Sequence, residues 1–240
     1  MVWLEMSLIG NVINEIKYNE IPIDGRIQTE NDTDISKIQM KAKIKFTIYD
    51  SNGKIVKQWE EPSKSLTYWY ALFEFNLWSQ GVLSLTDTSG TSITPYMGSP
   101  GVININAGSG VATYGIVVGS GNTANVSQKS MMYNMIALIP NGTASGQLTY
   151  QAVSFGTPSE SGNTSSWTLS RNFINQSGGT VNITEVGIIA YVSGFRLLNS
   201  VSSALVNPDY FLFAYDIPSS PISLANGQTL NISYTFTVVA

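Results

Sequence analysis

Two segments near opposite ends of the chain alternate strictly between apolar and polar side chains. The first spans residues 36–49 and the second spans residues 230–238. A period of two places successive side chains on opposite faces of a strand, so each segment predicts a β-strand with one buried face. The apolar positions are Ile38, Met40, Ala42, Ile44, Phe46 and Ile48 in the first segment and Leu230, Ile232, Tyr234, Phe236 and Val238 in the second.

Turn signals divide the rest of the chain into short strands. Residues 50–53 (DSNG) predict a tight turn, and residues 55–59 return as its hairpin partner. Later strands are expected at residues 82–85, 114–118, 131–139, 148–155, 167–173, 181–192 and 210–215, with Gly, Ser and Asn between them. Many short strands at this spacing predict an all-β fold, an antiparallel β-sandwich of the jelly-roll kind.

One segment favours a helix instead. Residues 64–78 are rich in aromatic and aliphatic side chains, with polar positions at helical spacing. Ser63 precedes them and is a residue type that caps helix N-termini. We therefore expect one short helix at about 64–78, although its aromatics would suit a strand equally well.

Charge is concentrated near the N-terminus. Residues 1–64 carry nine of the twelve Lys and Arg residues and ten of the sixteen Asp and Glu residues. We expect residues 1–34 to be an N-terminal arm, or an edge strand plus linker, and residues 35–240 to be the β-sandwich domain. An arm that lies on a neighbouring subunit would use the alternating apolar side chains of Val2, Leu4, Met6 and Leu8.

Composition argues against most kinds of catalysis. The chain has no Cys and no His, which removes cysteine nucleophiles, thiolate zinc sites and the usual general base. We expect no enzyme activity and no cofactor. A net charge of −4 argues against nucleic-acid binding. No apolar run reaches about 20 residues, so membrane insertion is not expected; residues 1–10 lack the pattern of a secretory signal, so we expect a chain released inside a cell or already processed.

Few charged residues are arranged for chemistry. Glu30, Asp32 and Asp34 could hold a calcium ion, but a solvated linker is the favoured interpretation. Glu60 and Glu61 should point to opposite faces of a strand. Glu185 lies in a nearly uncharged strand and is expected to pair with Arg171 or Arg196.

Two further patterns have more than one interpretation. Lys41, Lys43 and Lys45 share one face of the first strand, where they could grip an acidic neighbouring subunit or nucleic acid; an edge or solvent face protected against aggregation is favoured. Residues 115–121 contain a Gly-rich turn after a strand, which is expected to be a tight turn and no nucleotide site.

Seven Asn-x-Ser/Thr sequons occur in the chain. Asn182 and Asn231 fall in expected strands and would have to face outward. The other five fall in expected loops and are the candidate glycosylation sites: Asn31, Asn125, Asn141, Asn163 and Asn175.

A succession of short segments carries a family resemblance. They are residues 114–123 (YGIVVGSGNT), 146–156 (GQLTYQAVSFG), 170–179 (SRNFINQSGG), 183–188 (ITEVGI) and 225–236 (ANGQTLNISYTF). In this order they resemble β-rich, jelly-roll-like virion structural proteins of archaeal viruses and tailed phages. The resemblance implies a capsid, vertex or turret, decoration or tail-associated subunit without catalytic residues. The arm of residues 1–34 departs from the family pattern.

Three functions follow as hypotheses. The first is a virion structural protein whose partners are further copies of itself and other virion proteins, located in the virus particle. The second is an extracellular archaeal filament or cell-surface subunit assembled by strand donation. The third is a module that binds host-surface glycans or a receptor, in which Trp167 and Tyr150 would stack on sugars.

Overall fold

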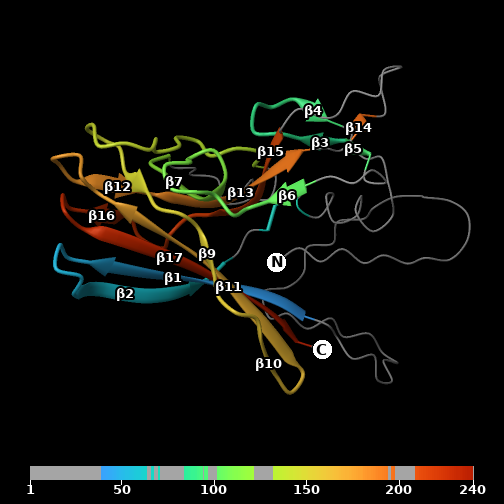
Figure 1. The fold of residues 1–240 in the computed structure, drawn as a ribbon, viewed down its shortest axis with the longest axis horizontal. Helices are drawn as coiled ribbons and strands as arrows, with labels where there is room; N and C mark the ends of the chain where they lie inside the picture. Colours follow the sequence, from blue (N-terminus) through green and yellow to red (C-terminus); the bar gives the residue numbers. More distant parts are fainter. Residues whose placement is uncertain are drawn as a thin grey trace, which may run out of the picture. The chain divides into compact units, whose positions relative to one another are not determined.

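The structure is a computed structural model that describes residues 39–63, 66–67, 70, 84–93, 95–96, 102–121, 132–193, 196–197 and 209–239. These residues form antiparallel β-sheets, so the expected all-β class is confirmed (Figure 1). The predicted arm of residues 1–34 lies outside the described residues, and so do its candidate contact residues Val2, Leu4, Met6 and Leu8.

The larger sheet has seven strands, all paired antiparallel. Its main path runs in the order β10 (Ser159–Ser161), β11 (Thr164–Ile174), β17 (Thr229–Val239), β1 (Gln39–Tyr49) and β2 (Ile55–Pro62). The short strands β8 (Thr149–Tyr150) and β9 (Ser154–Phe155) also pair with β11. The two alternating segments of the sequence are therefore hydrogen-bonded neighbours in the sheet, and their pairing runs from Gln39 opposite Val239 to Tyr49 opposite Thr229.

The second sheet has four strands. Its members are β15 (Asp209–Asp216), β13 (Glu185–Ser193), β6 (Val102–Asn104) and β7 (Gly115–Gly119), with β13 at the centre. Three two-stranded ladders complete the described strands: β12 (Val181–Ile183) with β16 (Ile222–Leu224), β14 (Arg196–Leu197) with β5 (Pro95–Tyr96), and β3 (Leu85–Thr86) with β4 (Ser92–Ile93).

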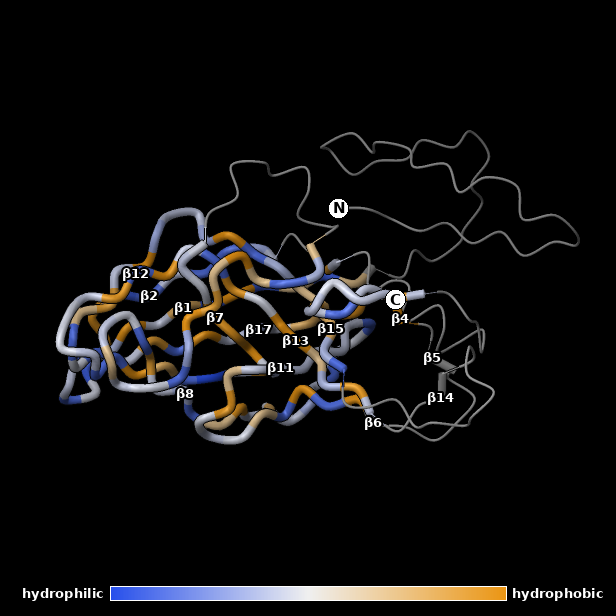
Figure 2. The backbone as a smooth tube through the Cα atoms, turned by 90° about the horizontal axis from the view of Figure 1, so that it is seen from above, coloured by the Kyte–Doolittle hydropathy of each residue, from blue (hydrophilic) through white to orange (hydrophobic). Residues whose placement is uncertain are grey.

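One continuous core fills the space between the two sheets. Ile44 and Phe46 from β1 and Ile232 from β17 are buried in it together with Ile116 from β7 and Ile188 from β13. Burying side chains of this size stabilises the folded state by about 1.5–3 kcal/mol each. This packing of sheet on sheet makes the domain a β-sandwich. Figure 2 shows the hydrophobic positions running along β7, whose five residues are all buried.

The second sheet is covered on its outer side as well. Leu85, Ala190, Val192, Phe211 and Phe213 form a smaller core cluster, against which Tyr70 and Ile93 pack. Strands β13 and β15 are therefore buried on both faces and read as continuous apolar runs in the sequence. The larger sheet differs because only its inner face is apolar.

The alternation predicted for the first strand is confirmed with one exception. Ile44, Phe46 and Ile48 are buried, whereas Lys41 and Lys43 are exposed. Thr47 is expected on the solvent face but is only 2% exposed. The turn at 50–53 and the hairpin to β2 are also confirmed, with Gly53 at φ 79°.

The strand expected at residues 131–139 is wrong. Residues 132–139 form no strand; only Leu138 makes an isolated bridge, to Gly119. The apolar composition that suggested a strand belongs to an irregular loop. Its backbone N–H groups are directed to a buried carboxylate rather than to a neighbouring strand, as described below.

The helix cap expected at Ser63 is also wrong. The Ser63 hydroxyl donates a hydrogen bond to the Asp216 carboxylate at 2.9 Å, and Leu66 forms a bridge to β15. Tyr70 is helical, and its N–H donates to the hydroxyl of Thr67, three residues earlier, at 3.3 Å. This is the capping geometry predicted for Ser63, moved to Thr67. The other residues of 64–78 lie outside the described residues.

Candidate interaction surfaces

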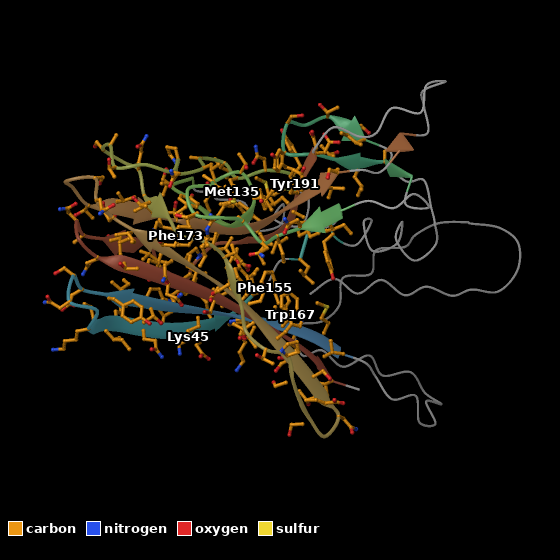
Figure 3. The ribbon with its side chains drawn as sticks, viewed as in Figure 1. Lys45, Met135, Phe155, Trp167, Phe173 and Tyr191 are labelled. Atoms are coloured by element: carbon orange, nitrogen blue, oxygen red, sulfur yellow. The ribbon has the colours of Figure 1, made fainter. Side chains whose placement is uncertain are left out.

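A row of three lysines runs along the outer face of the larger sheet. Lys41, Lys43 and Lys45, here called the lysine stripe, alternate with the buried side chains of β1, and Figure 3 places Lys45 on the side away from the core residue Phe173. Strand β1 pairs with β17 on one side and β2 on the other. The edge-strand interpretation of the stripe is therefore wrong, and it is a solvent-facing row in the interior of a sheet.

Small polar side chains surround the lysine stripe. In the β17 register, Lys41, Lys43 and Lys45 lie opposite Thr237, Thr235 and Ser233. Several polar side chains of this face are hydrogen-bonded to one another across the strands. The Thr168 and Thr235 hydroxyls are 3.2 Å apart, and the Asn231 amide donates to the Asn172 carbonyl oxygen at 2.7 Å. The result is a flat face of hydroxyls and amides, with positive charge along β1.

The inner face of the same sheet becomes exposed toward one end. Along β17, Ile232 and Tyr234 are fully buried, Phe236 is 5% exposed and Val238 is 38% exposed. Trp167 of β11 stacks on Phe236 with ring centroids 4.4 Å apart. We call Met40, Ala42, Phe155, Trp167, Phe236 and Val238 the apolar strip.

Phe155 is the most exposed aromatic ring of the apolar strip. It is 47% exposed and stacks on Trp167 with ring centroids 6.3 Å apart (Figure 3). Trp167 is half-buried, as a sugar-stacking side chain could be. Tyr150, the second candidate for stacking, is fully buried, and its hydroxyl donates to the Ile139 carbonyl at 2.6 Å. The interpretation of Tyr150 as a sugar contact is therefore wrong.

A second apolar surface lies on the irregular loop of residues 132–139. Tyr133, Ile136 and Leu138 expose between 38% and 47% of their surface. A cavity of about 470 Å³ opens beside this loop. No carboxylate, lysine or arginine is among its lining residues, which are Thr88, Ser89, Met132, Tyr133, Asn134, Met135 and Ile136.

A buried carboxylate anchors this loop from beneath. Glu185 of β13 is 0% exposed. Its Oε1 accepts from the N–H groups of Gly121 at 3.1 Å and Ala137 at 2.7 Å, and its Oε2 accepts from the Ile136 N–H at 3.0 Å and the Tyr215 hydroxyl at 2.8 Å. Four donors match the acceptor capacity of an ionised carboxylate. The expected ion pair of Glu185 with Arg171 is wrong, and the side chain of Arg196 lies outside the described residues.

Arg171 shows the opposite arrangement. Its guanidinium is 1% exposed and lies 4.8 Å from the centroid of the Tyr150 ring. All five of its N–H groups donate to backbone carbonyls, so they are saturated without a carboxylate. The acceptors are the carbonyls of Gly108, Val111, Tyr114, Ile116 and Gln151.

Burial shifts the pKa values of Arg171 and of two buried tyrosines, Tyr150 and Tyr215. It lowers the pKa of Arg171 to about 10, partly offset by Tyr150 and Tyr114, so the guanidinium is charged at neutral pH. Burial also raises the pKa values of the Tyr150 and Tyr215 hydroxyls, and for Tyr215 the bond to Glu185 adds to this. Both tyrosines are therefore neutral hydrogen-bond donors.

The structure brings together two carboxylates that are far apart in the sequence. Burial, followed by repulsion from Asp87, raises the pKa of Asp209 to about 6. The Asp87 carboxylate is hydrogen-bonded within the turn of residues 87–91, where its Oδ1 accepts from the Ser89 N–H at 3.0 Å and the Thr91 N–H at 2.7 Å. This pairing belongs to the turn that packs on β15, where the Thr88 N–H donates to the Tyr210 carbonyl.

Glu60 and Glu61, the adjacent acidic pair considered from the sequence, do not share a site. Glu60 and Glu61 lie on opposite faces of β2, as expected, opposite Lys45 and Ile44 of β1. Glu30, Asp32 and Asp34 lie outside the described residues. Within the described ranges, no three acidic, His or Cys side chains are close enough together to hold a metal ion.

The candidate glycosylation sites differ in accessibility. Asn163 is exposed in the turn between β10 and β11. Asn141 is exposed, but its Oδ1 accepts from the Tyr150 N–H at 3.0 Å. Asn175 is fully buried, and its amide donates to the carbonyls of Gly179 and Leu224, so the expectation of an accessible loop amide is wrong there. Asn31 and Asn125 lie outside the described residues.

Sequence reasoning missed the role of the Gly-rich turn and of Phe155. A Cβ at Gly121 would lie 2.7 Å from Glu185 Oε1 and 2.5 Å from the Ile136 Cβ. The glycines at 119 and 121 are thus required for close approach to the carboxylate. Glycines flanking one residue, with a lone Glu in an apolar strand, are the sequence signal that could have indicated this contact.

The fold and these surfaces define the class of protein as an antiparallel β-sandwich in which the buried side chains of Glu185 and Arg171 are bonded mainly to backbone groups. Comparisons with protein-family models, with curated proteins and with solved structures find no match. Among the described residues, no helix has the length and apolar character needed to span a membrane.

Proposed function

We propose that the chain is a structural protein of a virus particle that acts by assembling with further copies of itself and with other particle proteins. The observation that carries the proposal is the apolar strip, in which Phe155 and Val238 leave 47% and 38% of their surface exposed on the inner face of a well-packed sheet. Exposed apolar patches of this kind favour protein contacts. The resemblance to virion structural proteins supports a virus particle as the assembly, and the proposal includes the jelly-roll form of the sandwich that this resemblance implies.

The proposal includes the absence of catalysis, and the arrangement of charge supports it. Glu185 and Arg171 are the least exposed of the buried charged side chains, and their hydrogen-bonding capacity is taken up by backbone groups and one tyrosine. An acid or base for catalysis must reach a substrate proton. These groups instead fix the loops that carry the exposed surfaces.

A filament subunit assembled by strand donation is the second candidate. Strand β2 is the last strand of the seven-stranded sheet at its end of the path. It exposes 51% of Ile55 and 56% of Val56. An edge of this kind can accept a strand from another chain. Electron microscopy of the assembled chain would distinguish a filament from a shell or spike.

The test uses the full chain. Sedimentation velocity across a concentration series, followed by electron microscopy of the heaviest species, should reveal discrete oligomers. Mass spectrometry of particles purified from a culture that carries the gene should detect the chain as a stoichiometric component. A chain that stays monomeric at every concentration and is absent from purified particles contradicts the proposal.

A further inference from the structure

We infer that the lysine stripe is a docking surface for the acidic segment of residues 30–34 of a second copy of this chain. The inference rests on the proposed self-assembly and names one contact that would build it. The surface is described in the structure, and the segment is known from its sequence.

The surface is open to a partner. Lys41 and Lys43 are exposed and Lys45 is half-buried. None of the three forms an ion pair or hydrogen bond with a residue that the structure describes. The nearest carboxylate in register is Glu60, opposite Lys45, at one end of the stripe. Lys41 and Lys43 therefore present charges that have no counter-ion among the described residues, on a face of small side chains.

The segment and the stripe share the same period. Alternate residues on one face of a strand are about 6.6–6.8 Å apart. Glu30, Asp32 and Asp34 follow the same two-residue spacing as Lys41, Lys43 and Lys45, and no other segment of the chain carries three carboxylates at this spacing. An extended segment would place one carboxylate over each ammonium group.

Geometry favours a second copy over the same chain. Both edges of β1 are occupied by β17 and β2, so the segment has to lie across the outer face rather than add to an edge. Packed layers in proteins are about 10 Å apart. Only residues 35–38 separate Asp34 from the start of β1. To dock on the stripe of its own chain, the segment would need these four residues both to reverse the chain direction and to span the distance from the sheet to a layer above its outer face. A segment from a second copy has no such constraint.

The first experiment reverses each partner separately in the full chain. K41E/K43E/K45E and E30K/D32K/D34K should each weaken self-association roughly tenfold or more in sedimentation velocity, because three attractive pairs become repulsive. The control K54E/K57E changes the net charge in the same direction as the first variant but lies outside the stripe, and it should associate like the unaltered chain. Raising the salt from about 0.05 M to 0.5 M should weaken association of the unaltered chain by screening. Circular dichroism should report unchanged folding, since Lys41 and Lys43 are exposed and Lys45 is half-buried on the outer face of the sheet.

The second experiment mixes the two reversed variants. The acidic stripe of one variant then meets the basic segment of the other, so association should return in the mixture. The segment-reversed variant mixed with a K54E/K57E chain that lacks residues 1–34 should not recover, because neither chain of that mixture carries the acidic segment. This control excludes general attraction between unlike net charges. Recovery only when both reversals are in one chain would assign the contact to a single chain and overturn the inference.

The failures of the inference and of the proposed function are distinguishable. If both reversed variants associate as strongly as the unaltered chain, the inference is wrong while self-assembly stands. If the unaltered chain itself never associates, the proposed function fails and takes this contact with it.

Discussion

Glu185 and Arg171 are both buried charged side chains, one negative and one positive, and both are satisfied mainly by backbone groups. Each is a charged side chain in the interior, where an unpaired charge is costly. Glu185 is surrounded by donors, three of them backbone N–H groups, whereas Arg171 is surrounded by five backbone carbonyls. Most of the backbone groups that they bind lie outside the strands, and Ile116 of β7 is the exception among the acceptors of Arg171. They therefore replace the missing strand pairing of the loops.

Replacing Glu185 with Gln should destabilise the fold by about 1–3 kcal/mol, although the two side chains have the same shape. The amide NH₂ of Gln would face N–H donors and the Tyr215 hydroxyl, which can no longer all be satisfied. Denaturant unfolding measures the change. Glu160→Gln on the exposed strand β10 is the control and should stay within about 0.5 kcal/mol of the original chain. Equal stability of the two variants would contradict the anchoring role.

At the scale of elements, the loop of residues 132–139 packs closely against the Glu185 carboxylate because the residue beside them, Gly121, has no side chain. Gly121→Ala should destabilise the fold by about 1–3 kcal/mol, because its Cβ would overlap Ile136 and the Glu185 carboxylate. Gly179→Ala is the matched control, since nothing lies within 4 Å of its Cβ position. Thermal unfolding of the two variants separates steric overlap from the general effect of removing a glycine. A control that loses as much stability as Gly121→Ala would show that overlap is not the cause.

The turn that packs on β15 should make stability depend on pH. The pKa of Asp209 is about 6 in the folded chain and 3.8 as a free side chain, because burial and Asp87 disfavour its charged form. The folded state thus binds more protons between these values, and this group's contribution lowers stability as the pH rises from about 4 to 6. Asp209→Asn should therefore be more stable than the original chain at pH 7 and no more stable near pH 3.5.

Urea unfolding of the Asp209→Asn variant and the original chain over this pH range checks the sign. The size of the effect should be modest, because Asp209 is partly exposed and solvent screens it. A difference that grows toward low pH would contradict the assignment.

For the whole molecule, the described core begins at β1. The buried residues between the two sheets all belong to residues 44–236. Removing residues 1–34 should therefore leave the unfolding temperature within about 3 °C of the full chain. The same truncation should weaken self-association in sedimentation velocity, because it removes the acidic segment. A truncated chain that unfolds much earlier would place residues 1–34 in the domain rather than in an arm.

The parts of the fold that follow from local pattern were predictable. Strands β1 and β17 bury one face only, so their period of two is visible in the sequence, and the turn at 50–53 has its own local chemistry. Residues 132–139 were mistaken for a strand because their apolar side chains are compatible with one. Whether a segment pairs with a strand or wraps around a buried carboxylate depends on a residue far away in the chain.

The candidate surfaces also have features that local spacing predicts and features that only long-range pairing decides. The lysine stripe could be placed on one face from spacing alone, because strand geometry alternates side chains whatever the neighbours are. Its position in the interior of a sheet could not, because that depends on pairing with β17, almost at the other end of the chain. The apolar strip and the loop of residues 132–139 were not predictable as exposed surfaces.

The sequence by itself determined the fold class, the two alternating strands and the scarcity of catalytic side chains, since each depends on residue type and local spacing. Only the tertiary structure decided the partners of Glu185 and Arg171, the burial of Asn175 and the exposure of Phe155. The physical reason is that the hydrogen-bond partners of these side chains, and the side chains that bury them or leave them exposed, come from segments distant in sequence. Backbone N–H and C=O groups occur at almost every residue, so their meeting with a buried charge leaves almost no trace in the sequence.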